Sequence, residues 1–395
     1  MQSTPDLMTL EHRMNPYPLY AELRRDHPVC RVEPGGLVAI SRYKDVEYVL
    51  KHPEIFSSHG FQVAWQPEWV GDNPLAQSIA ASDGKEHTRL RALVSRAFTP
   101  VAINRLSERV RANASRLADD LLARGEADFM ESFAAPLPAR AISDLLGIDP
   151  SLERHYKRWT EVLVSITPVP ESAEHVSRTR DTLAEMKRHV QQLIDARRAQ
   201  PSDDVLGLIL RGGPDGQRLS DSEIIGLVFT LLTAGLETTS FLFTHAVRLL
   251  AERPDVLGRL RADRELLPKF IEEVLRYNGP VQALPRIAMS EVELAGVRIE
   301  RGACVLPLIA SANHDEARFP HPDRFDLDRE ELGIPFGYGT HYCLGAFLAR
   351  LEARAGLDAL LDRFSGFSLI SEGLVWNRGL LTSGPVKMPV RFLTN

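Results

Sequence analysis

The chain has 395 residues, 44% of them hydrophobic and 25% charged, which is the composition of an ordinary folded globular protein. Its 47 Lys and Arg residues against 53 Asp and Glu residues give a formal net charge of −6 without a basic block, so we do not expect a nucleic-acid partner. The cysteines, Cys30, Cys304 and Cys343, are odd in number and far apart, which favours a reducing compartment over a disulfide framework.

The N-terminal segment from Met1 to Asn15 carries several charged side chains and contains no apolar core of signal-peptide length. This segment therefore predicts neither export nor a membrane anchor. We expect a cytoplasmic protein.

After a proline-rich start, short apolar runs predict a helix near 17–24 and two strands, 29–32 and 37–40, joined by a hairpin turn at Glu33-Pro34-Gly35-Gly36. From Tyr43 onward apolar residues recur at the i, i+3, i+4 spacing of a helix. That spacing predicts helices over 43–51, 83–97, 101–124, 137–146, 152–164, 173–199 and 205–210. The expected fold class is mainly α with small β-sheets.

Two stretches interrupt the helical pattern. The segment 57–82 is rich in glycine and proline, and we expect its Phe61, Trp65 and Trp69 to lie in an irregular loop. The second interruption is Thr167-Pro168-Val169-Pro170. Long loops inside compact domains are usually functional or disordered, although Pro/Gly-rich stretches are by default plain connections.

A long central helix is predicted from Ser220 to about Ala251. Ser220-Asp221-Ser222-Glu223 reads as a capping box, in which the Ser220 hydroxyl bonds forward and the Glu223 carboxylate reaches back. The helix is apolar nearly all round, so it is buried either in a large core or in a bilayer. Glu237 and Arg248 interrupt the apolar run before about 18 uncharged residues accumulate, which favours burial in protein.

The middle of this helix, Thr233-Ala234-Gly235-Leu236-Glu237-Thr238-Thr239, is polar where packing alone favours leucine or alanine. Buried polar groups are costly unless they are satisfied, so the patch indicates a functional site. Gly235 permits close approach of a ligand, Thr238 can open the local hydrogen-bond ladder and bind water, and Glu237 with Thr238 can relay protons. The alternative is a satisfied buried Glu237 that braces a neighbour.

Glu273 and Arg276 lie three residues apart in a predicted helix over 266–277 and therefore share one face. The spacing alone means little, because the same pattern occurs at Glu22–Arg25, Glu86–Arg89, Glu108–Arg111 and Glu185–Arg188, where a solvated pair is the natural interpretation. Only position along the chain distinguishes this pair. It lies between the central helix and the segment that carries Cys343.

That segment reads Phe336-Gly337-Tyr338-Gly339-Thr340-His341-Tyr342-Cys343-Leu344-Gly345-Ala346 and runs into an amphipathic helix. Gly337, Gly339 and Gly345 allow positive φ and close approach to a flat cofactor, and the following helix N-terminus stabilises a thiolate, which can ligate iron. The alternative is a structural cysteine, since this residue often behaves as a small buried hydrophobe.

The order of these residues resembles the haem-ligating loop of the cytochrome P-450 superfamily, whose bacterial branch is soluble. The resemblance covers nearly the whole chain and implies one domain over residues 1–395, with a β-rich portion at about 25–60 and haem sandwiched between the long helix and the cysteine loop. It implies haem b as cofactor, with the Cys343 thiolate as its proximal iron ligand.

The same resemblance implies roles for other residues. Glu237 and Thr238 match the acid–alcohol pair that delivers protons during oxygen activation, and Glu273, Arg276 and Arg324 match a buried structural triad. The implied cofactor contacts are His87, Arg91, Ala234, Gly235, Arg286, Phe336, Gly337, His341, Cys343 and Gly345, of which His87, Arg91, Arg286 and His341 match propionate contacts. The implied substrate contacts are Phe61, Gln62, Trp65, Val169, Phe229, Leu284 and Leu381.

The implied activity is monooxygenation: insertion of one oxygen atom of O2 into a bulky hydrophobic small molecule, by hydroxylation or epoxidation. No flavin or iron–sulfur segment remains in the chain, so electrons are expected from NAD(P)H through a ferredoxin reductase and a ferredoxin, with Arg96, Arg350 and Arg354 as candidate docking contacts. Peroxide-driven or nitric-oxide-reducing haem-thiolate chemistry, a haem-binding sensor and a haem-free helical binding protein remain as alternatives.

Overall fold

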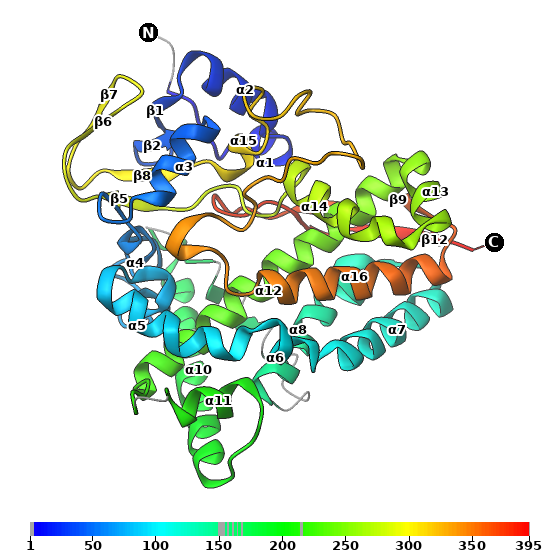
Figure 1. Ribbon diagram of the computed structural model, residues 1–395, viewed down its shortest axis with the longest axis horizontal. Helices are drawn as coiled ribbons and strands as arrows, with labels where there is room; N and C mark the ends of the chain where they lie inside the picture. The colour runs from blue at the N-terminus through cyan, green and yellow to red at the C-terminus, as the bar shows by residue number, and fades with distance from the viewer. Residues whose placement is uncertain are drawn as a thin grey trace. The chain divides into compact units, whose positions relative to one another are not determined.

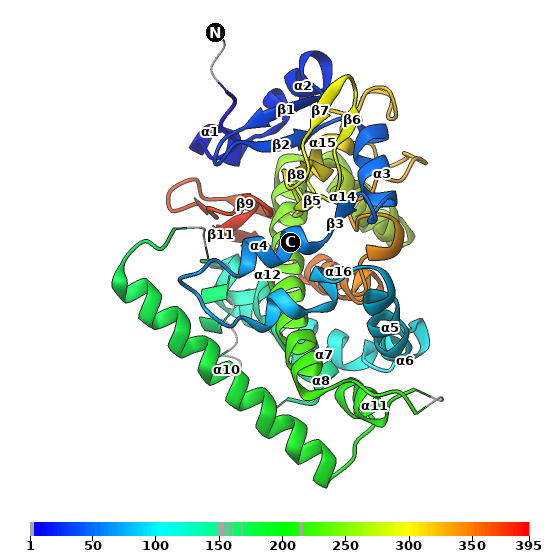
Figure 2. The same cartoon turned by 90° about the vertical axis from the view of Figure 1, so that its left-hand side faces the viewer.

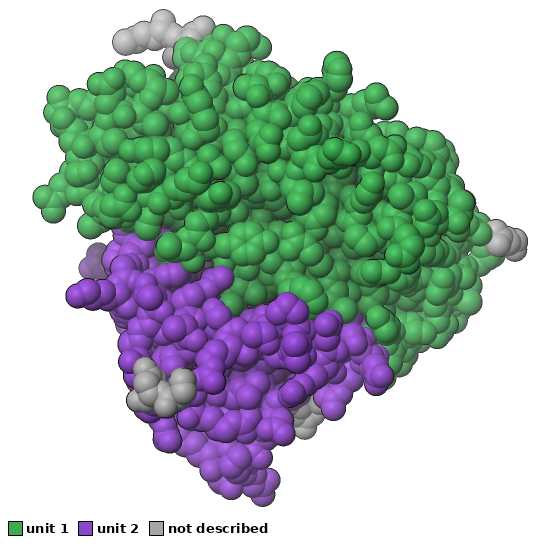
Figure 3. All heavy atoms as spheres, in the orientation of Figure 1, with its two compact units in different colours: residues 1–56, 111–137, 238–395 green, residues 57–110, 138–237 purple. Residues whose placement is uncertain are grey.

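The computed structural model describes residues 4–148, 155, 158–159, 162–163, 165–166, 169–213 and 216–394, apart from the side chain of Trp65. Helices dominate and the sheets are small (Figures 1 and 2), which confirms the expected fold class. The chain divides into two compact units, residues 1–56, 111–137 and 238–395 and residues 57–110 and 138–237 (Figure 3). The expectation of one domain stays a prediction.

The first unit contains most of the sheet structure together with the helices that carry the cysteine loop. Two longer helices, α7 (Ser107–Arg124) and α12 (Asp221–Glu252), belong to it only in their C-terminal parts. The complete helices are α1 (Leu10–Met14), α2 (Tyr17–Asp26), α3 (Tyr43–Lys51), α13 (Pro254–Ala262), α14 (Leu267–Tyr277), α15 (Ile309–Ala312) and α16 (Ala346–Arg363). Short 3-10 turns lie at η6 (Arg264–Leu266) and η7 (Gly339–His341), and a π-helical turn lies at η4 (Met130–Ala134). α14 and α16 pack side by side (Figure 1).

The largest sheet joins segments from both ends of the chain in the strand order β1-β2-β8-β5-β3. β1 and β2 form the predicted antiparallel hairpin, β2 pairs in parallel with β8, and β8 pairs antiparallel with β5. The strands are β1 (Val29–Val32), β2 (Leu37–Ile40), β3 (Phe56–Ser57), β5 (Arg286–Ala288) and β8 (Cys304–Pro307). Apolar clusters cover this sheet, one built around Ile40, Phe56 and Val305 and the other around Leu23, Ala39 and Leu306.

Three smaller sheets complete the β-structure. β6 (Val292–Leu294) and β7 (Val297–Ile299) form a hairpin, and β10 (Val375–Trp376) pairs with β11 (Pro385–Lys387). β12 (Pro389–Leu393) lies between β4 (Glu126–Asp128) and β9 (Gly366–Leu369) and pairs antiparallel with both. These strands are two to five residues long, too short for a reliable alternation signal in sequence.

The second unit is helical. Its elements are α4 (His59–Trp65), η1 (Pro74–Gln77), η2 (Ile79–Ala81), α5 (Gly84–Ser95), η3 (Arg96–Phe98), α6 (Pro100–Asn104), α8 (Pro136–Leu146), α10 (Ala173–Ala199), α11 (Val205–Arg211) and the N-terminal part of α12. The prediction of an irregular loop over 57–82 was wrong in part, because α4 and the two 3-10 turns lie within it. The helix predicted over 152–164 lies largely outside the described residues.

α12 begins as the sequence predicts. The Ser220 N–H donates to the Glu223 carboxylate at 2.7 Å, and the Glu223 N–H donates to the Ser220 hydroxyl at 3.3 Å, which confirms the capping box. Among the helices of the described residues, α12 alone is long and apolar enough to cross a membrane. Of its apolar 18-residue stretch, 56% is buried within the protein. Burial on that scale is typical of a core helix.

Candidate active site

The cysteine loop is held in shape by its own backbone. The Cys343 N–H donates to the Phe336 carbonyl at 3.0 Å, and the Tyr342 N–H donates to the Gly339 carbonyl at 3.1 Å. Cys343 is exposed and lies three residues before Ala346, the first residue of α16. Gly345 occupies the N-cap without a side-chain cap, so the positive end of the α16 dipole is directed towards the loop and favours a thiolate there.

The glycines of this loop have different roles. Gly337 and Gly339 have φ of 74° and 71°, in the left-handed region, as expected. A Cβ at Gly339 would lie 2.8 Å from the Leu50 carbonyl oxygen, so this glycine also lets the loop pack against the end of α3. Gly345 has φ of −84°, and the expectation of positive φ at this position was wrong.

The three cysteines differ in how far they are buried. Cys30 and Cys304 are half-buried in β1 and β8, and burial raises the pKa of both thiols, which disfavours their thiolate forms. Cys343 is the exposed cysteine of the three. The protein therefore presents one cysteine that is suited to ligating a metal.

Arg350, on the first turns of α16, fastens the cysteine loop to α14. Its guanidinium binds Glu272 of α14 in a bidentate pair, with Nε donating to Oε1 at 2.5 Å and Nη2 donating to Oε2 at 3.0 Å. The same guanidinium donates to the Tyr342 hydroxyl at 3.4 Å and lies 4.4 Å from the centre of the Phe336 ring. Arg350 was expected to be a docking contact, but its donors are engaged within the protein.

The contacts of Arg350 with Glu272 and Tyr342 form a clamp on the loop, and a buried ion-pair network begins at the next residue of α14, Glu273. Arg276 Nε and Nη2 donate to the two Glu273 carboxylate oxygens at 2.7 and 2.8 Å, and both side chains are at most 5% exposed. Arg276 also donates to the carbonyls of Asn313 and Pro322, each at 2.9 Å. Glu273–Arg276 is thus the buried structural pair that its position in the chain predicts.

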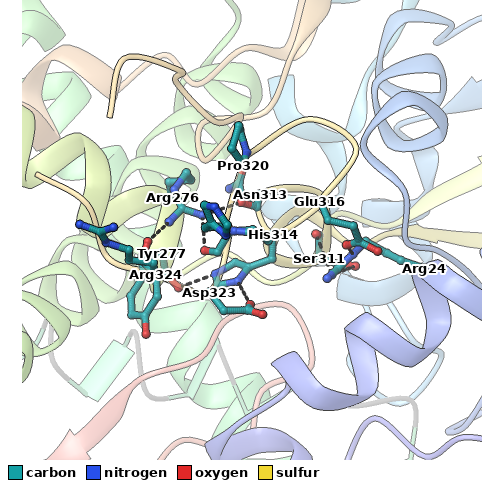
Figure 4. Close-up of polar contacts among 12 residues, drawn as sticks. Arg24, Arg276, Tyr277, Ser311, Asn313, His314, Glu316, Pro320, Asp323 and Arg324 are labelled. Carbon is teal, nitrogen blue, oxygen red and sulfur yellow. Dashed lines mark hydrogen bonds and ion pairs between the residues drawn. The ribbon is translucent and has the colours of Figure 1, made fainter. Parts of the chain in front are cut away.

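The third side chain of the network is that of Arg329, not that of Arg324. Arg329 Nε lies 3.3 Å from Glu273 Oε1, and the Arg329 side chain is 5% exposed. Arg324 is exposed and contributes its backbone carbonyl, which accepts from Arg276 at 3.3 Å (Figure 4). The expectation for Arg324 was wrong because the segment lacks a helical or strand period that would indicate which arginine turns inward.

Hydrogen bonds connect this network to the cysteine loop. The side-chain oxygen of Asn313, whose carbonyl binds Arg276, accepts from the Ile334 N–H at 2.7 Å. The Ile334 carbonyl in turn accepts from the Gly337 N–H at 3.0 Å. A Cβ at Gly333 would lie 2.5 Å from the Asn313 side-chain oxygen, so the chain passes this point without room for a side chain. The buried charges thereby fix where the loop begins.

The middle of α12 has one open face. Ala234 is exposed, although it lies at the centre of a helix whose neighbouring turns are mostly buried, and Thr230 and Thr238, four residues away on either side, are half-buried. Residues spaced by four share a helix face. Glu237 is also half-buried. The helix is continuous through this region, and the Thr233 hydroxyl donates to the Phe229 carbonyl at 2.9 Å.

Two predicted contacts on α12 do not belong to this open face. Phe229 is 0% exposed and lies five residues, or about 140° of helical rotation, from Ala234, so its side chain faces the core. A Cβ on Gly235 would lie 2.7 Å from Cδ1 of Ile142 in α8. Gly235 therefore allows close packing of two helices. The expected contacts of Gly235 with the cofactor and of Phe229 with the substrate stay predictions.

The predicted propionate contacts are distributed between the two units. His87 and Arg91 are four residues apart in α5, His87 being buried and Arg91 half-buried. Arg286 is buried in β5, with Nη1 donating to the Pro285 carbonyl at 2.9 Å, and His341 is half-buried in η7. Their convergence on one cofactor stays a prediction.

The predicted substrate contacts have contrasting environments. Phe61 and Gln62 of α4 are half-buried, as are Leu284 and Leu381, and Leu284 lies 3.7 Å from the position of a Cβ on Gly337 of the cysteine loop. Val169 is 75% exposed. The side chain of Trp65 lies outside the described residues, as do Thr167 and Pro168 of the second interruption.

Sequence reasoning missed Arg329 and the Glu272–Arg350–Tyr342 clamp. Glu272 directly precedes Glu273 in α14, and two consecutive glutamates in one helix are the signal that could have indicated a second ion pair. No comparable signal exists for Arg329, which lies in a segment without regular structure.

Comparisons with known proteins agree with this geometry. The family model "Cytochrome P450" matches residues 158–372. "Cytochrome P450 109" of Bacillus spizizenii is 39% identical over 90% of this chain and 86% of its own length. "Cytochrome P450 monooxygenase PikC" of Streptomyces venezuelae is 38% identical over 96% of this chain and 91% of its own.

Solved structures extend the likeness to the fold. Cytochrome P450 CYP109Q5 from Chondromyces apiculatus is 35% identical, with a TM-score of 0.91 and coverage of 100% of both chains. CYP109E1 from Bacillus megaterium, solved in complex with testosterone, is 32% identical, with a TM-score of 0.88 and coverage of 97% of this chain and 99% of that one.

Proposed function

The chain belongs to the cytochrome P450 family and is a haem-thiolate monooxygenase, and on that premise we propose that it hydroxylates or epoxidises a bulky hydrophobic small molecule, a secondary metabolite, with one oxygen atom of O2. The observation that carries this proposal is the single exposed cysteine at the N-terminus of α16, in a loop anchored to a buried ion-pair network. Haem bound through a cysteine thiolate supplies the oxygen-activating chemistry, because the ligand donates electron density to iron.

The residues present fit a haem group. Cys343 is exposed just before the N-terminus of α16, where no side chain caps the first helix N–H groups. Ala234, at the centre of the apolar helix α12, is a small exposed residue. We propose haem b as the group held there, with Cys343 as the iron ligand and Phe336 and Gly337 lining the loop. His87, Arg91, Arg286 and His341 would bind the two propionates through charge-assisted hydrogen bonds.

The chain's own residues have three tasks in this reaction. The α16 dipole keeps the Cys343 sulfur deprotonated, and the Arg350 clamp fixes its direction. The Glu237 carboxylate takes up protons, and the Thr238 hydroxyl passes them to the oxygen site. This acid–alcohol pair favours O2-dependent monooxygenation over the peroxide-driven alternative, which needs no delivery of protons to O2.

We assign substrate binding to a small set of apolar side chains and one polar side chain. Phe61, Leu284 and Leu381 are half-buried apolar side chains, and Gln62 supplies a polar contact. Such a set suits a bulky hydrophobic molecule with a polar group, because apolar walls give affinity and a few polar groups fix orientation. Testosterone bound to the Bacillus megaterium relative is a molecule of that kind.

Electrons must arrive from outside the chain. We propose NAD(P)H, a ferredoxin reductase and a ferredoxin as the donors, acting in the cytoplasm, and the two units working as one domain. Arg354 of α16, 47% exposed, is a candidate contact for the acidic carrier, as is Arg96.

The cysteine assignment is tested by spectroscopy of the reduced carbon monoxide complex. Cys343→Ala should abolish the red-shifted band typical of a thiolate ligand, whereas Cys304→Ala, which removes a half-buried cysteine, should retain it. An unchanged spectrum in Cys343→Ala would refute the ligand assignment.

The proton route is tested separately. Thr238→Ala should divert electrons from product to hydrogen peroxide, measured as the ratio of product to NAD(P)H consumed. Thr233→Ala is the matched control, because its hydroxyl is bonded to the Phe229 carbonyl. Equal coupling in both variants would remove Thr238 from the route.

A further inference from the structure

A cavity lies within the first unit, and none of the residues that line it is assigned above to haem or substrate. Its volume is about 450 Å³. Its walls come from the start of α2, the C-terminal end of α12, the end of α14, and the segments around Asp323 and Trp376. His245, one of its lining residues, lies seven residues after Thr238 on α12, about 10 Å along the helix.

Aromatic rings form much of the cavity wall. Tyr17 of α2 stacks on His314 with ring centroids 4.1 Å apart, and Tyr277 at the end of α14 lies 5.5 Å from the same imidazole. Trp376 lines another wall. Aromatic faces carry a negative quadrupole and attract organic cations.

Two carboxylates, Glu252 and Asp323, and one arginine, Arg248, line the cavity. Asp323 accepts from His314 at 3.0 Å (Figure 4), and this bond holds the pKa of Asp323 below its ordinary value, so the carboxylate is ionised at neutral pH. Burial raises the pKa of the Tyr277 hydroxyl, the Asp323 and Glu252 carboxylates add to the rise, and the charges of Arg276 and Arg253 oppose it. Two carboxylates therefore lie near one aromatic wall.

The cationic side of the cavity is already engaged. Arg248, its one arginine, pairs with Glu252 at 3.4 Å and lies 5.3 Å from the centre of the Trp376 ring. Burial lowers the pKa of His245 to about 4, so this histidine is neutral at physiological pH. The Asp323 side chain is 77% exposed, and the charges of Arg24 and Arg276, which do not line the cavity, also lower its pKa. Each of these two arginines is itself paired, Arg24 with Glu316 and Arg276 with Glu273.

Two buried polar atoms of the lining residues are unsatisfied in the described part of the chain. His245 Nε2 donates to the Ser383 carbonyl at 2.9 Å, which makes Nδ1 an acceptor, and Nδ1 has no hydrogen-bond partner. The Trp376 Nε1–H, a donor, has none either, and the two rings lie 5.8 Å apart. A hydroxyl or a water molecule can serve both, because it accepts and donates.

We propose that this cavity binds a small organic cation that carries an ammonium group and a hydroxyl group. The ammonium lies against Tyr17, Tyr277 and Trp376, with Glu252 and Asp323 as counter-charges. The hydroxyl completes the hydrogen bonding of His245 and Trp376. The site is independent of the proposed monooxygenation, and its test does not require turnover.

Choline is the probe, since its quaternary nitrogen cannot ligate iron. Two analogues of the same shape provide the comparison: neutral 3,3-dimethylbutan-1-ol and anionic 3,3-dimethylbutanoate. In isothermal titration of the haem-loaded protein, choline should bind at least about 10-fold more tightly than either analogue, and raising the salt concentration should weaken it. Equal affinity of choline and the alcohol, tighter binding of the anion, or no heat with choline would overturn the proposal.

Two variants test whether choline binds in this cavity. Glu252→Gln should lower choline affinity by about 3- to 10-fold and leave the affinity for the alcohol unchanged. Its side chain is 57% exposed, so the variant should fold. Glu330→Gln, an exposed carboxylate outside the cavity, is the matched control and should bind choline as the parent does. Unchanged choline affinity in Glu252→Gln would remove the cation from this cavity.

Discussion

Arg350 joins three parts of the molecule through one guanidinium: α16, which carries it; α14, through Glu272; and the cysteine loop, through Tyr342 and Phe336. Lysine keeps the charge at such a site but not the planar fork that makes two parallel bonds and stacks on a ring. The geometry of the guanidinium, rather than its charge, therefore matters for the loop.

Arg350→Lys should loosen the loop and so increase the fraction of the reduced carbon monoxide complex that lacks the thiolate-type band. Loss of these charge-assisted bonds costs about 1–3 kcal/mol, and the midpoint of thermal unfolding should fall by a few degrees. Arg354→Lys changes an exposed arginine of the same helix and is the control. If the two variants give the same spectrum and the same midpoint, the loop does not depend on the clamp.

At the scale of residues, sequence reasoning identifies a functional side chain when the residues that shape its surroundings are its neighbours in the chain. Cys343 is recognisable because the surrounding glycines and the following helix are adjacent in the chain. Arg329 is not, because its partner Glu273 lies 56 residues away and the segment between has no period that fixes side-chain direction. The helix contact of Gly235 was also missed: its missing Cβ faces Ile142, and sequence cannot distinguish a glycine that allows a helix contact from one that allows a ligand contact.

At the scale of elements, the segment 320–334 is held to α14 by the Glu273 network rather than by regular structure. Glu273 accepts from the Asp326 N–H at 2.9 Å as well as from Arg276 and Arg329. Arg329 Nη1 and Nη2 in turn donate to the carbonyls of Pro320 and His321 at 3.0 and 3.2 Å. One buried carboxylate thus organises a long irregular segment.

Arg329→Ala should destabilise the protein by about 3–5 kcal/mol, because it leaves part of the Glu273 charge without compensation. Arg324→Ala should change stability by no more than about 0.5 kcal/mol, since that side chain is exposed. Urea unfolding of the two variants measures both values. A larger loss in Arg324→Ala than in Arg329→Ala would reverse the assignment of the third side chain.

The contact of α8 with α12 gives a second prediction for elements. Alanine at position 235 improves helix propensity by about 1 kcal/mol, but its Cβ would lie 2.7 Å from Ile142 Cδ1, and overpacking costs about 1–3 kcal/mol. The change in unfolding free energy caused by Gly235→Ala should therefore be less favourable in the parent than in the Ile142→Val variant, which lacks that methyl group. A double-mutant cycle of unfolding free energies should give a coupling of about 1 kcal/mol or more, and a coupling of zero would exclude the contact.

Most long helices could be predicted from periodicity, several of them to the residue: the expected 43–51 and 173–199 are α3 and α10. The helix expected over 101–124 is instead divided into α6 and α7, because the apolar period continues across the turn at Arg105. The strands of the main sheet pair segments more than 250 residues apart, as β2 does with β8. Such pairing depends on packing of the whole chain, which periodicity does not encode.

At the scale of the whole molecule, two buried ionisable side chains make large and opposite contributions to how stability responds to pH. His245 on α12 is 4% exposed, and burial, reinforced by the Arg248 charge, lowers its pKa to about 4. Glu352 on α16 is 2% exposed, its Oε2 has no hydrogen-bond partner in the described part of the chain, and burial raises its pKa to about 8. Both side chains are therefore neutral in the folded protein near neutral pH.

The two groups act in opposite directions. In the unfolded chain His245 titrates near 6.5, so its contribution to stability is complete above that pH and is lost as the pH falls to about 4. Glu352 titrates near 4.5 when unfolded, so stability falls as the pH rises from 4.5 to about 8. The shifts correspond to free energies of the order of 3 kcal/mol for His245 and 5 kcal/mol for Glu352.

The two effects should cancel between about pH 4.5 and 6.5 and leave a fall in stability between about pH 6.5 and 8. Glu352→Gln should remove that fall, so that its unfolding midpoint exceeds the parent's by an amount that grows with pH up to about 8. His245→Gln can still donate to the Ser383 carbonyl and should lose the acid-side decrease below about pH 6.5. Calorimetric unfolding midpoints of each variant, taken relative to the parent at the same pH, isolate the contribution of the replaced group. If the difference between Glu352→Gln and the parent does not vary with pH, Glu352 is ionised in the folded protein.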